Sequence, residues 1–169
     1  STFLASAEAD GLYSFGFFAE DAAGNREAVR RTTVAVDDTP PAVALAVHGS
    51  SYPVGGRLFV ASSALFEVTA VDPISGGVAS GLGAAEVRVD TYPFALFASS
   101  FTLPAGPHLI ELRARDRVGN ESATLARDVF VDTVAPVSTF AAGAPQADLD
   151  GGVLLVSPLT LLLVISTDP

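Results

Sequence analysis

Two short segments of the chain carry the same polar residues at the same spacing. An aspartate is followed four positions later by an asparagine, with a glycine directly before it, at Asp21 and Asn25 and again at Asp116 and Asn120. Carboxylate and amide oxygens are ligands for hard cations such as Ca²⁺. The same side chains also close tight turns by hydrogen bonding to nearby backbone groups. The pattern therefore points to a cation site or to a structural turn.

No other group of residues has the composition of a catalytic site. The two histidines, His48 and His108, have no serine or carboxylate at the spacing of a catalytic motif. The chain contains no cysteine, no glycine-rich phosphate loop and no histidine cluster of the kind that binds a transition metal. We therefore expect no enzymatic activity and no cofactor other than calcium.

The net charge of −10 bears on the class of partner. Without a cationic surface, a chain cannot displace counterions from nucleic-acid phosphates, and its charge disfavours binding to anionic lipid. An exported protein without cysteine is typical of bacteria. The most apolar segment, residues 153–165, is interrupted by Ser157, Pro158 and Thr160 and is too short for a spanning helix. We expect a secreted or bacterial cell-surface protein with no nucleic-acid partner and no membrane insertion in this segment.

The sequence repeats itself with a period of about 95 residues. A series of residues from Gly11 to Pro41 recurs without a gap 95 positions later, between Gly106 and Pro136. A second series, in residues 55–73, recurs 96 positions later in residues 151–169. A period of this length is close to the roughly 100 residues of a seven-stranded sandwich and far longer than a solenoid unit. Each repeat is therefore predicted to be a domain.

Within the repeat, apolar and polar residues alternate as in half-buried strands. Residues 108–115 place Ile110, Leu112 and Ala114 on one face and charged side chains on the other. Residues 65–71, 85–90 and 125–131 alternate likewise, and glycine-containing turns separate them. No segment has convincing helical periodicity. The pattern predicts an all-β antiparallel sandwich.

Ala-x-Asp-x-x-Gly-Asn, a strand and then Val-Asp-x-x-x-Pro occupy residues 19–41 and again residues 114–136. This order of motifs resembles the immunoglobulin-like tandem repeats of large bacterial surface adhesins and outer-membrane-associated proteins. The chain departs from the pattern where Val134 and Ala135 replace the first proline of the second linker, and in the very apolar residues 161–163. The resemblance implies tandem immunoglobulin-like β-sandwich domains: the C-terminal half of one repeat at 1–40, a complete repeat at 41–135 and the N-terminal half of a further repeat at 136–169.

The resemblance also implies a spacer or adhesive context without fixing a ligand. We expect a structural segment of a long surface-displayed repeat protein, such as an adhesin or filament stalk. The alternative is a module that recognises a glycan or a protein. The expected partners are neighbouring repeats of the same chain, with other copies or a cell-surface ligand as further candidates.

Four aspartates should meet at one end of the complete domain in such a sandwich. The loop that contains Asp116 and the loop that starts at Asp72 lie where the chain enters, next to the linker acids Asp37 and Asp38. Converging carboxylates at a domain junction predict a calcium site that would stiffen the array. The alternative is that Asp116 caps the turn before Asn120, and that the linker aspartates cap turns of their own.

Two further features of the sequence have a structural interpretation. Tyr13 and His108 occupy the same repeat position, and both are predicted to hydrogen bond back to the backbone as in a tyrosine corner. Tyr92, Phe94 and Phe97 lie close together in the sequence and would either stack on a sugar or contribute to the core.

Each incomplete repeat would expose an apolar face and unpaired strand edges. We expect a longer polypeptide to continue on both sides, the alternative being that the first part of one copy pairs with the last part of another.

Overall fold

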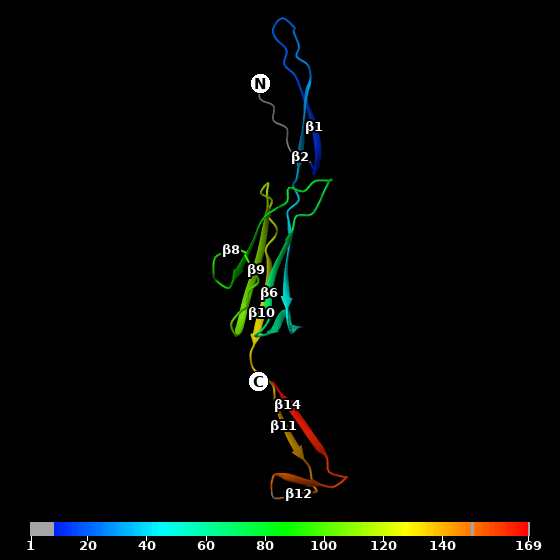
Figure 1. Ribbon diagram of the computed structural model, residues 1–169, viewed down its shortest axis with the longest axis vertical. Coiled ribbons are helices and arrows are strands. Elements are labelled where there is room, and N and C mark those ends of the chain that lie inside the picture. Colours follow the sequence, from blue (N-terminus) through cyan, green and yellow to red (C-terminus); the bar gives the residue numbers. More distant parts are fainter. Residues whose placement is uncertain (1–8, 150, 169) are drawn as a thin grey trace. The chain divides into compact units, whose positions relative to one another are not determined.

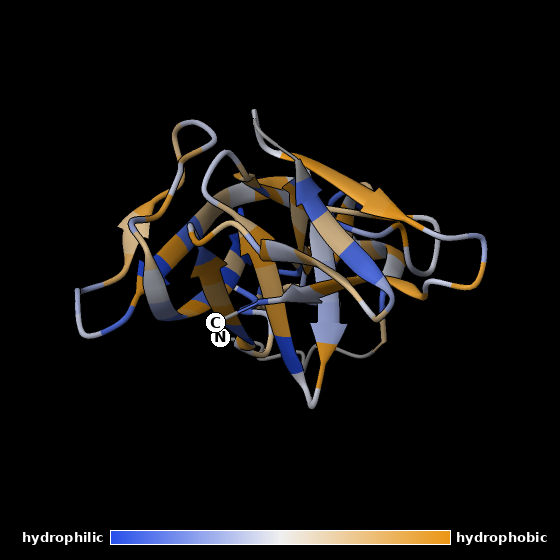
Figure 2. Cartoon of the chain, turned by 90° about the horizontal axis from the view of Figure 1, so that it is seen from below, coloured by the Kyte–Doolittle hydropathy of each residue, from blue (hydrophilic) through white to orange (hydrophobic). Residues whose placement is uncertain are grey.

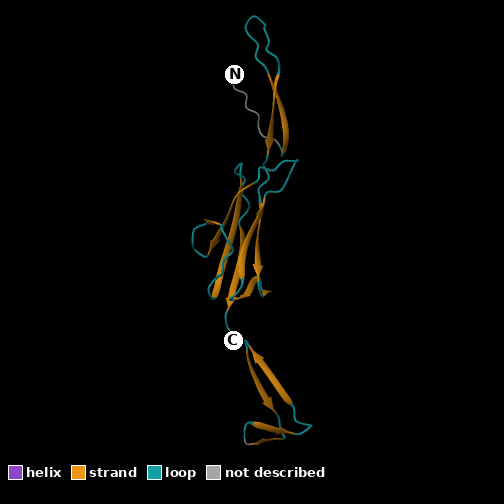
Figure 3. Cartoon of the chain, in the orientation of Figure 1, coloured by secondary structure: helices purple, strands orange, loops and turns teal. Residues whose placement is uncertain are grey.

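The computed structural model describes residues 9–149 and 151–168, and these residues are all-β. They form fourteen strands joined by loops and turns and contain no helix (Figure 3). The chain divides into two compact units after Asp132. The strands of the first unit are β1 (Gly11–Phe17), β2 (Arg30–Val36), β3 (Ala42–His48), β4 (Ser51–Val54), β5 (Arg57–Ala61), β6 (Leu65–Val71), β7 (Leu82–Val89), β8 (Ala95–Leu96), β9 (Gly106–Asp116) and β10 (Leu125–Asp132). The strands of the second unit are β11 (Val137–Ala142), β12 (Gln146–Leu149), β13 (Val153–Val156) and β14 (Leu162–Thr167).

Strands β3 to β10 form two packed layers (Figure 1). One layer is a six-stranded sheet in the order β4-β5-β10-β9-β7-β8, and the other is the pair β3-β6. Phe66 of β6 and Phe101 extend the smaller layer by exchanging two backbone hydrogen bonds of 2.8 and 3.0 Å. All strand pairs in these layers are antiparallel except β5 and β10, which run parallel.

The core lies between these two layers. Phe66 of β6, Ile110 and Leu112 of β9, and Val129 of β10 are at most 1 % exposed. Ala114 is buried as well, whereas Glu111 and Arg113 are half-buried and Arg115 is exposed. The predicted alternation along residues 108–115 is therefore confirmed, because successive side chains of a strand point to opposite faces. Figure 2 shows the same alternation as changes between hydrophobic and hydrophilic colour along single strands.

The strand pairing repeats along the chain with the spacing seen in the sequence. Gly11 pairs with Val36 in β1-β2, and Gly106 pairs with Val131 in β9-β10, each residue 95 positions further along. The pairs Leu45–Val68 and Val54–Arg57, of β3-β6 and β4-β5, recur as Phe140–Val164 in β11-β14 and Leu149–Val153 in β12-β13. In both cases the first residue is displaced by 95 positions and the second by 96. The register of these strand pairs thus recurs with the period of the sequence.

The second unit consists of two separate two-stranded sheets, β11-β14 and β12-β13. Its strands carry apolar residues that remain exposed, among them Phe140, Leu162 and Val164. The unit thus has the strand pairs that correspond to β3-β6 and β4-β5, but its apolar side chains are not enclosed.

Candidate functional site

Three of the four aspartates expected at the domain junction lie together in the first unit. Asp37 directly follows β2, Asp72 directly follows β6, and Asp116 is the last residue of β9. One carboxylate oxygen from each lies within 4.8 Å of the others. Calcium binds oxygen at about 2.4 Å, so that two oxygens on one ion are up to about 5 Å apart. The spacing of the three carboxylates fits a shared cation.

The Asp116 carboxylate is held by the tight turn that follows it. Its Oδ1 atom accepts backbone hydrogen bonds from Val118 (3.0 Å), Gly119 (2.6 Å) and Asn120 (2.8 Å), and its Oδ2 atom accepts one from the Asn120 side chain (2.7 Å). Burial by itself raises the pKa of the Asp116 carboxyl, but these hydrogen bonds outweigh it and lower the pKa below its usual value. Each carboxylate oxygen has about two lone-pair sites, so the turn occupies Oδ1 fully and leaves one site on Oδ2. Asp116 could therefore offer its Oδ2 atom, as well as its charge, to a cation.

The other two carboxylates have free acceptor capacity. Asp37 accepts a hydrogen bond of 2.6 Å from the Ser80 backbone, and Asp72 accepts one of 2.6 Å from the Gly81 backbone. The second oxygen of Asp72, Oδ1, is buried and has no hydrogen-bond partner among the described residues, and neither has the Ser80 hydroxyl. A buried acceptor without a partner costs about 1–3 kcal/mol, and more if it is charged. Of the three aspartates, Asp72 would therefore be stabilised most by a bound cation.

Asp38 does not belong to this group. Its backbone N–H donates to the carboxylate of Asp10, which also accepts from the Thr39 hydroxyl. Hydrogen bonds from Ser75, Thr39 and Asp38 lower the pKa of Asp10. Sequence reasoning missed Asp10 because the residue 95 positions later is Ala105, so the repeat gave no signal there.

The turn-capping interpretation holds in both repeats. Asp21 accepts backbone hydrogen bonds from Ala23 (2.9 Å) and Asn25 (2.8 Å), and a side-chain hydrogen bond from Asn25 (2.7 Å). These bonds match those of Asp116 and Asn120, although Asp21 is exposed. The turn therefore closes without neighbouring carboxylates. A cation at Asp116 would bind to a turn that is already formed.

The predicted hydrogen bonds of Tyr13 and His108 back to the backbone are confirmed. The Tyr13 hydroxyl donates to the carbonyl of Ala9 (2.6 Å), four residues upstream, and His108 Nε2 lies 3.1 Å from the carbonyl of Pro104, also four residues upstream. His108 Nδ1 lies 2.8 Å from the Asp90 carboxylate. This hydrogen bond, and one from the Leu109 backbone, lower the pKa of Asp90.

The three aromatic residues considered for sugar stacking do not share one surface. Tyr92 is exposed, Phe97 packs against the core, and Phe94 lies beneath the guanidinium groups of Arg88 and Arg113 at 4.6 and 4.4 Å from its ring centre. Of the candidate sugar-stacking rings, Tyr92 therefore has the most accessible side chain.

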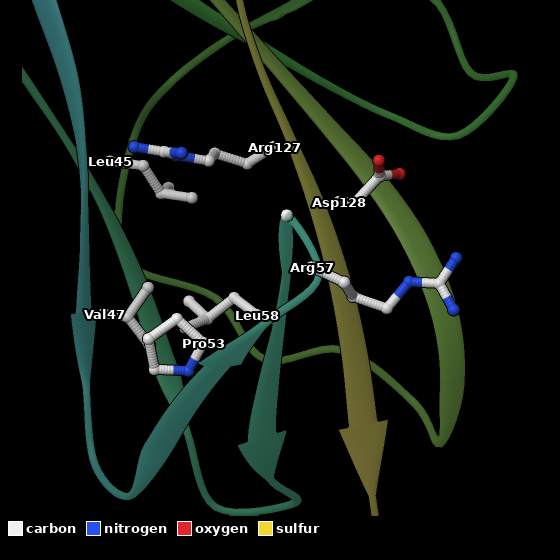
Figure 4. A pocket seen from close by; sticks show the side chains of 8 residues that line it. Leu45, Val47, Pro53, Arg57, Leu58, Arg127 and Asp128 are labelled. Carbon is white, nitrogen blue, oxygen red and sulfur yellow. The ribbon is translucent and has the colours of Figure 1, made fainter.

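An apolar groove of about 360 Å³ lies between β3 and the β4-β5 hairpin, beside β10. Leu45, Val47, Pro53 and Leu58 line it, and Figure 4 shows the Arg127 side chain extending alongside Leu45. Arg57 and Asp128 extend in the opposite direction. The groove is thus mostly hydrocarbon, and the charged residues Arg57, Arg127 and Asp128 also contribute to its lining.

The sequence matches no protein-family model and no curated protein. Within residues 9–149 and 151–168, no helix is long and apolar enough to cross a membrane.

Proposed function

We propose that this chain is a structural spacer built from tandem immunoglobulin-like β-sandwich repeats, within a secreted or surface-displayed bacterial protein. The observation that carries the proposal is the repetition of strand register at 95 and 96 positions, since an array of similar domains needs the same hairpins at a constant period. Such a segment would hold another part of the protein away from the cell.

The connection into the complete sandwich supports this role. The backbone carbonyl of Asp37 accepts a hydrogen bond of 2.9 Å from the Asn120 side chain, and its carboxylate accepts one from Ser80. Asp10 binds the next two linker residues, and Pro41 is buried. A spacer keeps a fixed length only if its linkers resist bending. A proline-containing linker that hydrogen bonds hold on both sides resists bending.

The proposal is tested on residues 41–135 expressed alone. We expect a β-type far-UV circular dichroism spectrum and a cooperative thermal transition, because the enclosed core of β3 to β10 lies within this segment. A helical spectrum or the absence of a cooperative transition would overturn the proposal that each repeat is a domain.

We propose in addition that the junction binds Ca²⁺ through the carboxylates of Asp37, Asp72 and Asp116. The buried, unpartnered Oδ1 atom of Asp72 supports this, because a cation would satisfy it. Titration calorimetry of the 1–169 chain with Ca²⁺ should give binding heat that Asp72→Asn weakens. Asp128→Asn, which removes an equal charge from an exposed strand position, should leave binding unchanged. No heat, and no change in melting temperature with chelator, would leave turn capping as the role of these acids.

A further inference from the structure

Strand β3 of the complete sandwich is an edge strand without the features that usually prevent edge pairing. It pairs with β6 on one side, and no described strand pairs with its other side. Proline, charged side chains or very short length commonly keep an edge strand from pairing with another chain. At the edges of the six-stranded sheet, β4 contains Pro53 and β8 has two residues. Strand β3 has seven residues, Ala42–His48, and contains neither proline nor an acidic residue or arginine.

The free side of β3 presents the backbone groups of Val43, Leu45 and Val47. On β6, Phe66 directs its N–H and C=O groups to Phe101, away from β3. Because this direction alternates along a strand, Phe66 and Val47 form a non-hydrogen-bonded pair of the β3-β6 ladder. The N–H and C=O groups of Val43, Leu45 and Val47 therefore point away from β6, and no described residue hydrogen bonds to them there.

The sequence of β3 reads the same in both directions about Leu45. Ala44 and Ala46 flank Leu45, and Val43 and Val47 follow on either side. If two copies of β3 lie antiparallel with the two Leu45 residues opposite each other, Val43 of each copy lies opposite Val47 of the other. These residues have outward backbone groups, so each pair would exchange both hydrogen bonds of an antiparallel ladder. The edge is thus complementary to itself, as an interface on a two-fold axis requires.

The side chains also fit such a pair. Leu45 and Val47 are half-buried and point from β3 into the apolar groove (Figure 4), so pairing would bring the apolar rims of the two grooves together. On the other face, Ala44 of one copy would lie opposite Ala46 of the other, where two methyl groups meet without a clash. Arg127 extends alongside Leu45, and each copy has a net charge of −10. Like-charge repulsion should therefore weaken the contact at low salt.

We propose that two copies of this chain pair through β3, antiparallel and centred on Leu45, so that their β3-β6 layers join into one continuous sheet. The occupant of the edge is a second copy because the strand is its own antiparallel complement and brings no charged side chain of β3 to the axis. Its counterpart β11 has the sequence VSTFAA, which is not symmetric, so the contact joins the same repeat of each copy.

The contact goes beyond the spacer role. Specific stable interfaces bury about 1,200–2,000 Å². A contact limited to one strand from each copy is smaller, so we expect a weak dimer whose population rises with concentration. Arrays joined in this way run in opposite directions, as arrays that project from facing surfaces do. That consequence rests on the proposed function, whereas the strand pairing itself does not.

Disulfide trapping in the 1–169 chain tests the register, since the chain has no cysteine of its own. In the proposed pair, Ala44 lies opposite Ala46 of the other copy with Cα atoms about 4.5 Å apart, whereas the two Ala44 residues are diagonal neighbours at about 7–8 Å. A disulfide needs about 4.4–6.8 Å. Under mild oxidation, a mixture of Ala44→Cys and Ala46→Cys chains should form a covalent dimer on a non-reducing gel. Each variant by itself should not, whereas random collision would link all combinations equally.

Light scattering of the unmodified chain over a range of concentrations tests association directly. We expect the mass to rise with concentration, and more steeply at high salt. Val43→Pro should abolish the rise, because it removes an outward N–H group and leaves the hydrogen bonds to β6 in place. Ser138→Pro, at the corresponding position of β11, is the matched control and should leave the rise unchanged.

A mass that stays monomeric at every concentration would overturn the β3 contact. Self-linking of Ala44→Cys or Ala46→Cys as efficient as cross-linking in the mixture would overturn the register and with it the contact. Neither result would alter the thermal transition of residues 41–135, which tests the proposed function separately.

Discussion

Truncation of Leu112 to alanine should remove a side chain that is enclosed on all sides. Leu112 is 1 % exposed, and its neighbours in register, Val87 on β7 and Leu125 on β10, both pack against the same core. Leu→Ala substitutions in cores cost about 2–5 kcal/mol, and the larger costs come from sites that cannot collapse around the cavity. Leu112 lies on the buried face of β9, one of the two central strands of the six-stranded sheet. We therefore expect Leu112→Ala to lower the free energy of unfolding by about 3 kcal/mol.

The assay is thermal unfolding of residues 41–135 and its variants. For a domain of this size, 1 kcal/mol shifts the melting temperature by about 4–8 °C, so that Leu112→Ala should lower it by about 12–24 °C. Arg113→Ala is the control on the opposite face. Arg113 is 2.6 Å from Glu86 and stacks on Phe94, and exposed interactions of these kinds contribute about 1 kcal/mol or less each. Equal shifts for Leu112→Ala and Arg113→Ala would mean that the two faces of β9 are assigned the wrong way round.

Two further predictions concern acid sensitivity and the contact of the first hairpin with the sandwich. Asp90 and Asp116 have lowered pKa values in the folded state, so each contributes stability that is complete above the unfolded pKa of about 3.9 and is lost as the pH falls through the folded pKa. The melting temperature should therefore decrease as the pH is lowered below about 4, and Asp90→Asn should make this decrease smaller. The same pH dependence of the melting temperature in Asp90→Asn and in the unsubstituted chain would contradict this prediction. Gly76→Ala should increase proteolysis between β2 and β3 more than Gly77→Ala does. Both glycines have positive φ, +57° and +82°, but only at Gly76 would a Cβ overlap the backbone carbonyl of Asp10. Equal proteolysis would show that the Asp10 contact is unimportant.

Features that depend on residues close in sequence were predictable. The alternation along residues 108–115 predicted which side chains of β9 are buried, because a strand directs successive side chains to opposite faces. The turn at Asp116 and the corner at His108 were predictable for the same reason, since their hydrogen bonds to the backbone mostly span two to four residues. The repeat strengthened both predictions by showing the same residue types at Asp21 and Tyr13.

Features that join distant residues were decided by the tertiary structure. Asp10 reaches linker residues 28 and 29 positions away, and Asn120 binds a carbonyl 83 positions away. No local pattern distinguishes Asp37, whose carboxylate joins the acidic group, from its neighbour Asp38, whose backbone binds Asp10 instead. That choice depends on which way the linker turns as it enters β3, and it is fixed by packing between segments that the sequence alone does not place. The sequence therefore determined the strands and their turns, while the docking of the loops at the end of the sandwich determined which carboxylates meet.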